Sequence, residues 1–106
     1  MKVFLYDAET EYKFDDRDDD DDTDLEAAIE EFYELSEEKG SVFGILTTSN
    51  DIVQFSYAYD NKWILDISSK HNPQKLDRRI VDYEEGIEII KSVFTGSTVE
   101  EIRKIH

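Results

Sequence analysis

The chain has 106 residues, of which 39% are hydrophobic and 12% aromatic, and its formal net charge is −15. These values predict a single globular domain over residues 1–106 and exclude a wholly disordered chain. The sequence contains no cysteine, no signal-peptide pattern and no apolar run long enough to span a membrane, which favours a cytoplasmic protein with no membrane partner.

The negative charge is concentrated in one part of the sequence. Residues 7–38 contain 17 acids and two bases, whereas the rest of the chain contains ten acids and ten bases. A local field of this kind attracts basic proteins and repels nucleic acids and anionic membranes. We therefore expect a basic protein partner and no nucleic-acid partner.

The N-terminal part of the chain predicts a strand, an acidic loop and a helix. Residues 2–7 alternate as in a strand, and residues 8–14 are compatible with a second arm. The run Asp-Asp-Arg-Asp-Asp-Asp-Asp-Asp at 15–22 predicts an exposed loop, because neighbouring carboxylates repel each other and Asp disfavours both regular structures.

A capping box of Thr23 and Glu26 predicts the start of a helix over residues 24–39, and Gly40 predicts its end. One face of this helix is apolar at the spacing of 3.6 residues per turn, with Leu25, Ala28, Ile29, Phe32 and Leu35.

The central part of the chain predicts an antiparallel meander of three strands over 42–47, 52–59 and 62–67. We expect the face with Val53, Phe55 and Tyr57 to be covered by the helices. Aromatic side chains at strand spacing are more often core than ligand surface, and we interpret this set as core: Tyr57, Tyr59 and Trp63.

The C-terminal part begins with residues 68–78, which we interpret as a polar loop, followed by a short strand at 80–81. A second helix is expected from about residue 82 to Gly96, with an apolar stripe of Ile87, Ile90 and Phe94 flanked by Ile89 and Val93. A short third helix is expected to begin at Thr98. The predicted fold is therefore α+β, an antiparallel sheet of about four to five strands with two main helices and a short C-terminal helix.

The sequence offers little for catalysis or for a bound metal. A calcium loop counted from Asp20 places Leu25 where the turn requires glycine, so we expect no specific metal site. There is no nucleophile elbow, phosphate-binding glycine loop or zinc spacing, and neither His71 nor His106 lies in a catalytic motif. We therefore expect a protein that is not an enzyme and carries no cofactor.

The acidic residues themselves are the strongest functional signal, and we interpret them as a surface that binds a partner. A solvated loop with no role beyond solubility is the simpler alternative. The basic residues Lys70, Lys75, Arg78 and Arg79 are expected to pair internally with the acidic segment. The predicted partner-binding residues lie in the Asp run and on the first helix, namely Asp18, Asp19, Asp20, Asp21, Asp22, Asp24, Glu30, Glu31 and Glu34.

Residues 79–96, which run from Arg79 through Tyr83 and Phe94 to Gly96, resemble the C-terminal end of bacterial polymorphic-toxin immunity proteins. In those families a helix that ends in Phe-x-Gly or Phe-x-x-Gly follows a strand meander, and the meander here, from Ile52 to Ile67, is similar in order. The tryptophan common near the end of the family is absent here. The resemblance covers roughly residues 42–105 and has no counterpart for the Asp run.

This resemblance implies a small, non-catalytic inhibitor that binds a basic toxin domain, of nuclease or deaminase type, and blocks its active site. Our first hypothesis is therefore an acidic immunity-like inhibitor. The alternative is a nucleic-acid-mimic or adaptor module that binds another basic protein through the same surface. A gene for a basic toxin-like protein immediately upstream would separate the two hypotheses.

Overall fold

The computed structural model describes residues 1–15, 22–69, 72–96 and 101–102. The described residues have an α+β fold, as expected. Their strands and helices follow one another in the order β1 Lys2–Tyr6, β2 Lys13–Asp15, α1 Leu25–Glu34, β3 Val42–Leu46, β4 Ile52–Tyr59, β5 Lys62–Ser69, β6 Asn72–Asp82 and α2 Tyr83–Phe94.

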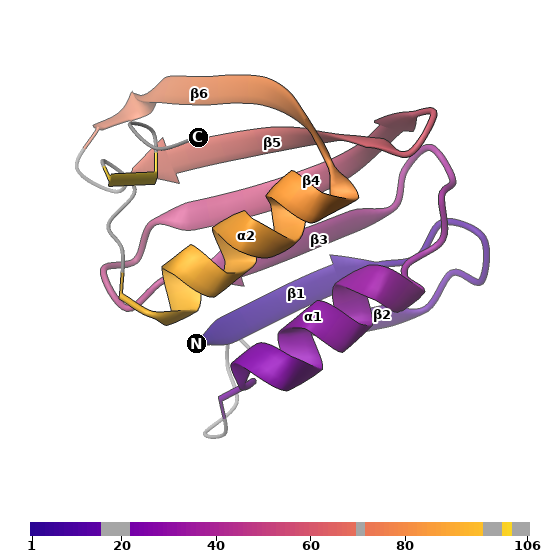
Figure 1. Cartoon of the computed structure of the whole chain (residues 1–106), viewed down its shortest axis with the longest axis horizontal. Helices are drawn as coiled ribbons and strands as arrows, with labels where there is room; N and C mark the ends of the chain where they lie inside the picture. Colours follow the sequence, from indigo (N-terminus) through magenta and orange to yellow (C-terminus); the bar gives the residue numbers. More distant parts are fainter. Residues whose placement is uncertain (16–21, 70–71, 97–100, 103–106) are drawn as a thin grey trace.

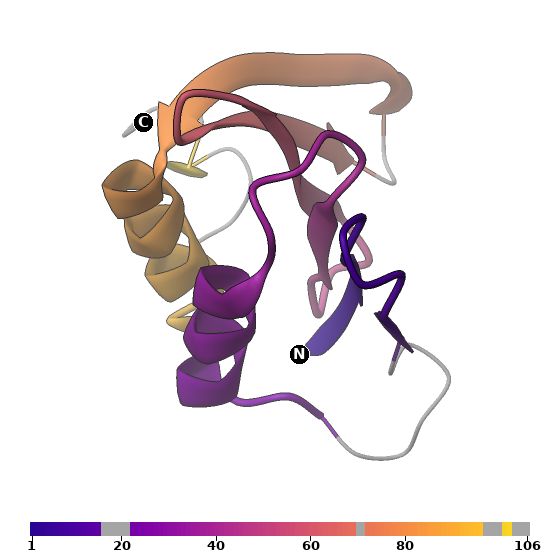
Figure 2. The ribbon, with the colours of Figure 1, turned by 90° about the vertical axis from the view of Figure 1, so that its right-hand side faces the viewer.

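The strands form one antiparallel sheet in the order β2-β1-β3-β4-β5-β6. Both helices lie on the same face of this sheet, and neither described helix covers the other face (Figures 1 and 2). Over the described residues the sheet has six strands rather than the four to five expected. Of the second arm considered over 8–14, only Lys13 and Phe14 belong to a strand, the short edge strand β2.

The core lies between the helices and the sheet, and Phe32 on α1 is at its centre. The Phe32 ring is fully buried. Its centroid lies 5.1 Å from those of Phe55 on β4 and Trp63 on β5, and 5.2 Å from that of Tyr83 on α2. The prediction that the helices pack on the face with Val53, Phe55 and Tyr57 is confirmed.

The first helix begins and ends at different residues from those predicted. Its N-cap is Asp24, whose Oδ1 accepts a hydrogen bond from Ala27 N at 2.8 Å. The predicted capping box with Thr23 at the N-cap is therefore wrong, because the neighbouring Asp serves as the cap instead and, when ionised, also complements the helix dipole. The helix ends at Glu34 and not at residue 39.

The predicted loop at 68–78 is also wrong, because most of it belongs to β5 or β6. β6 runs antiparallel to β5, with Asp66 opposite Arg78 and Ile64 opposite Ile80. Pro73 interrupts the strand pattern in the sequence, but β6 is an edge strand, where a residue without an N–H is tolerated.

The second helix confirms its predicted ends, since Asp82 caps α2 by accepting from Glu85 N and Gly96 adopts a φ of 99° just after it. Its buried face includes three residues of the predicted stripe, Ile89, Ile90 and Val93, together with Gly86. The other two stripe residues, Ile87 and Phe94, are only partly buried.

Gly86 allows the close approach of this helix, because a Cβ there would lie 3.1 Å from the Phe32 ring. Of the predicted third helix, only Glu101 and Ile102 are described. Both are helical, and Ile102 is buried. The rest of that predicted helix lies outside the described residues.

Candidate functional site

The structure separates the nine predicted binding residues into groups with different surroundings. Asp18 to Asp21 lie outside the described residues. The other five are described, and they divide into carboxylates that bond within the fold and carboxylates that face solvent on α1, as follows: Asp22, Asp24, Glu30, Glu31 and Glu34.

Asp22 is bound to the start of the chain. Its Oδ1 lies 2.9 Å from Lys2 Nζ, and its Oδ2 lies 3.5 Å from the Met1 amino group. The backbone adds a hydrogen bond from Thr23 N to Met1 O at 3.0 Å. The hydrogen bond from Lys2 and the charge of the amino terminus lower the pKa of the Asp22 carboxyl. Asp22 therefore binds the start of the chain and Asp24 caps α1, so both aspartates have structural roles.

Asp7, another member of the acidic segment, organises a network of hydrogen bonds. It accepts from Ser36 Oγ at 2.7 Å, from Ser36 N at 3.0 Å and from the N–H groups of Glu9 and Thr10. Ser36 Oγ is also 3.0 Å from Ser41 Oγ. Burial raises the pKa of Asp7, but the hydrogen bonds from Ser36, Thr10 and Glu9 outweigh this effect and lower the pKa to about 2.

The outer face of α1 carries a row of glutamates that we call the glutamate line: Glu26, Glu30 and Glu34. They are spaced by four residues, so they lie one above the other on the helix. All three are exposed, and within the described part of the chain none of them has an ion-pair partner. Like charges at this spacing cost the helix roughly 0.2–0.5 kcal/mol per pair. The glutamate line is therefore not explained by stability.

Glu31 does not belong to this line. It is half-buried and contributes to a small cavity of about 170 Å³ under the β1–β2 connection, together with Leu5, Asp7, Thr10, Tyr12, Glu34 and Leu35. Glu30 and Glu34 therefore share the exposed glutamate line, whereas Glu31 is half-buried beside a cavity that Glu34 also lines.

A second feature near the end of α1 was not predicted from the sequence. It is a groove of about 660 Å³, which we call the tyrosine–carboxylate groove. Three parts of the fold meet in it: the C-terminal end of α1, the β4–β5 turn and the junction of β6 with α2. Its walls are formed by Tyr33, Glu37, Asp60, Asn61, Lys62, Asp82, Tyr83 and Glu84.

The two tyrosines form the aromatic wall of this groove. Their rings are stacked, with centroids 5.8 Å apart and planes 14° apart. Tyr33 is 62% exposed, so one face of its ring is open to solvent while Tyr83 covers the other. Burial raises the pKa of the Tyr83 phenol, and the negative charge of Glu37 raises it further. Tyr83 is therefore uncharged at neutral pH.

Four of the other six residues that line the groove are carboxylates, and the fold holds two of these four in place. With its amide nitrogen turned towards Glu37, Asn61 donates to both oxygens of that carboxylate, at 2.5 and 2.7 Å, and Asp82 caps α2. Asp60 and Asn61 have φ values of 46° and 62°, typical of a two-residue hairpin turn, which presents Asp60 at the rim. The groove contains four carboxylates and one lysine, and no ion pair involves the four among the described residues.

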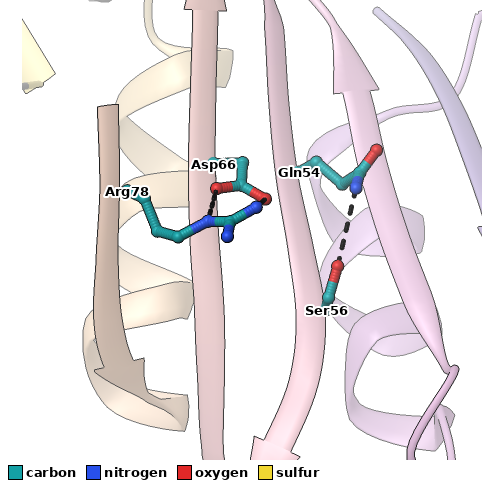
Figure 3. A network of polar contacts seen from close by, with 4 residues as sticks. All are labelled: Gln54, Ser56, Asp66 and Arg78. Carbon is teal, nitrogen blue, oxygen red and sulfur yellow. Dashed lines mark hydrogen bonds and ion pairs between the residues drawn. The ribbon is translucent and has the colours of Figure 1, made fainter. Parts of the chain in front are cut away.

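The uncovered face of the sheet has a different character. Arg78 on β6 donates from Nε and Nη2 to the two carboxylate oxygens of Asp66 on β5, at 2.7 and 3.2 Å (Figure 3). The hydrogen bonds with Asp66, and then its charge, raise the pKa of Arg78. On β4, Gln54 donates to Ser56 across 3.5 Å. We expected Arg78 to pair with the N-terminal acidic segment. It pairs instead within the sheet, with Asp66.

The remaining predictions about sites have mixed outcomes. Trp63 is fully buried and Tyr57 partly buried, as expected for core, but Tyr59 is 57% exposed. His71 and His106 lie outside the described residues. Over the described ranges, no group of three or more His, Cys, Asp or Glu side chains is arranged to hold a metal ion, and no helix is long and apolar enough to cross a membrane.

The groove was missed because its residues come from distant segments, each of which has an ordinary local explanation. Asp60 and Asn61 indicate a turn, and Asp82 indicates a helix cap. The one available signal was Tyr33, which lies off the apolar stripe of its helix.

In comparisons with known proteins, no family model, no curated protein and no solved structure matches this chain.

Proposed function

We propose that this protein binds a basic protein partner through the glutamate line, and that it acts as an immunity-like inhibitor that blocks a basic toxin domain of nuclease or deaminase type. The observation that carries the proposal is the difference in charge between the two layers of the fold. The two helices contain seven acids and one base, whereas the six strands contain four acids and six bases.

The charge of the glutamate line is available for binding because none of its three carboxylates has an ion-pair partner among the described residues. Lys91 lies 3.6 Å from Glu88 on α2, and α1 contains no basic residue. Exposed charges of one sign steer an oppositely charged protein into contact and accelerate association, with a strong dependence on salt. Rapid capture suits an inhibitor that must neutralise an enzyme as soon as it appears.

The Asp run adds to the same field. Asp18 to Asp22 carry five formal negative charges immediately before α1, although only Asp22 lies in the described residues and is already paired. In this proposal the run contributes to long-range attraction, while the glutamate line contacts the partner directly. Replacement of Asp18 to Asp22 by Asn is expected to slow association and to leave dissociation nearly unchanged.

The proposal can be tested by affinity capture from the native host, with the intact chain as bait and two variants of equal charge as controls. Glu30→Gln/Glu34→Gln removes two charges from α1. Glu9→Gln/Glu11→Gln removes two exposed charges outside both the helix layer and the Asp run. We expect the wild type and the second variant to capture the same basic protein and the first variant to capture much less of it.

The identity of the captured protein decides between the two hypotheses. An immunity-like inhibitor should suppress the toxicity of its partner on co-expression and abolish its catalytic activity when purified. If the captured protein is a nucleic-acid-binding protein without toxicity, and duplex DNA competes with this chain for it, the mimic or adaptor hypothesis replaces the first. Equal capture by both variants would contradict the role of the glutamate line.

A further inference from the structure

We propose that the tyrosine–carboxylate groove binds the guanidinium group of an arginine side chain presented by the basic partner. This inference rests on the proposed function, because it names the side chain by which the partner docks. None of the groove residues was among the predicted binding residues, and the groove lies where α1 ends, next to the glutamate line.

The aromatic wall gives the groove a preference for a flat cation. Tyr83 covers one face of the Tyr33 ring and holds it nearly parallel to its own, so a single ring face is presented to solvent. A guanidinium group is planar and weakly hydrated, and it stacks on such a face by cation–π attraction. The ammonium group of lysine is compact and strongly hydrated, so it gains less from the same surface.

The carboxylates supply the complementary charge. Glu37 is fixed by the Asn61 amide, and Asp60 and Glu84 have no ion-pair partner among the described residues. An arginine fork donates several hydrogen bonds in fixed directions, which matches carboxylates held on different elements around one ring. Lys62 is the only base in the groove wall, so the net charge of the groove remains negative.

Other occupants fit the groove less well. Anions are disfavoured by four carboxylates against one lysine. A quaternary ammonium ligand requires several aromatic faces around it, whereas two parallel rings present one. A divalent metal requires converging ligands, and no such group occurs in the part of the chain that the structure describes. A guanidinium group uses both the ring face and the dispersed carboxylates.

The test uses two synthetic peptides of equal length and charge, one of alternating Gly and Arg and one of alternating Gly and Lys. Each is titrated at low salt into the isotopically labelled full-length protein. The chain has one tryptophan, and Trp63 lies against Tyr83, so its indole N–H signal reports on the groove. We expect the Arg peptide to bind about two- to fivefold more tightly than the Lys peptide, the range for an exposed cation–π contact.

Variants assign this preference to the ring. Tyr33→Ala should reduce the affinity for the Arg peptide to that for the Lys peptide, whereas Tyr33→Phe should retain the preference. Tyr12→Ala is the matched control, because Tyr12 is 58% exposed and lies outside the groove. Tyr33 is also largely exposed, and the dispersion of the amide spectrum verifies that each variant is folded.

The possible outcomes separate this inference from the proposed function. Equal affinities for the two peptides, or a preference that survives Tyr33→Ala, would overturn the arginine site and leave charge-driven binding of a basic protein intact. Absence of binding by either peptide would also overturn the site. Loss of the preference in Tyr33→Ala alone, with Tyr12→Ala behaving as the wild type, supports it.

Discussion

The uncovered face of the sheet and the outer face of α1 both carry charged side chains, but they arrange them in opposite ways. On the sheet, Asp66 is paired with Arg78 by two hydrogen bonds (Figure 3). On α1, Glu26, Glu30 and Glu34 stand in line without a basic residue in the helix. The sheet balances its charges locally, whereas the helix retains an imbalance that opposes folding. We infer that the second arrangement serves binding.

The acidic segment, residues 7–38, also contains both carboxylates that are bonded within the fold and carboxylates that are not. Asp7, Asp22 and Asp24 are used within the fold, as a hydrogen-bond acceptor, an ion pair and a helix cap. The three carboxylates of the glutamate line have no ion-pair partner within the described residues. A count of charge along the sequence therefore overstates the charge that a partner can reach, because part of it is already bonded.

The largest effect is expected at two neighbouring aromatic residues of α1 that differ in burial, because Phe32 is fully buried and Tyr33 is 62% exposed. Phe32→Ala removes the ring at the centre of the core and should lower the free energy of unfolding by about 3–5 kcal/mol. Tyr33→Ala removes a largely exposed ring and should cost about 1 kcal/mol or less. Urea unfolding followed by tryptophan fluorescence measures both. Similar losses for the two variants would contradict the described orientation of the helix.

The second effect concerns the carboxylate that the fold uses most. The Asp7 pKa of about 2 lies below its ordinary value of 3.8, so ionised Asp7 stabilises the native state above pH 3.8. This contribution is lost as the pH falls towards 2. We expect Asp7→Asn to cost about 1–2 kcal/mol at pH 7, and the difference from the wild type to shrink below pH 4.

Glu30→Gln is the control for the Asp7 variant. Glu30 is exposed and makes no ion pair among the described residues, so its neutralisation should not lower the free energy of unfolding at pH 7. Unfolding in urea at a series of pH values measures both variants. A Glu30→Gln loss as large as that of Asp7→Asn would show that the two carboxylates are not used differently.

A smaller effect, of opposite sign, is expected when the glutamate line is interrupted by a base. Glu30→Lys replaces two repulsive contacts by attractive ones, with Glu26 and Glu34, and should stabilise the fold by about 1 kcal/mol. The same variant should bind the basic partner more weakly. Thermal unfolding and partner titration are measured on one preparation. A variant that is less stable and binds equally well would contradict the inferred conflict between stability and binding.

Much of the fold could be predicted from the sequence because its signals are local. The strand predicted over 52–59 is β4 without a change of boundary, and Asp82 and Gly96 delimit α2 as expected. The end of α1 could not be predicted, because it depends on a contact 29 residues away in the chain. Ser36 N and Oγ donate to Asp7, which fits the departure of the chain from the helix at Leu35.

The candidate site was predicted less completely than the fold, because most of it depends on contacts between residues that are far apart in the sequence. The spacing of Glu30 and Glu34 on one helix is local, and the sequence placed them together. The tyrosine–carboxylate groove depends on how α1, the β4–β5 turn and the β6–α2 junction meet. Neither the stacking of Tyr33 on Tyr83 nor the hydrogen bonds of Asn61 to Glu37 follow from spacing in the sequence.

The central claim is that the position of the charges, on the glutamate line and in the Asp run before it, and not the net charge of the whole chain alone, sets the rate at which the partner binds. The most direct test is the association rate of the captured partner at several salt concentrations, measured by surface plasmon resonance. Glu30→Gln/Glu34→Gln and Glu9→Gln/Glu11→Gln remove the same charge from different places. We expect the first variant to associate more slowly and with a weaker dependence on salt, and the second to associate nearly as the wild type does. Equal slowing by both variants would contradict this account.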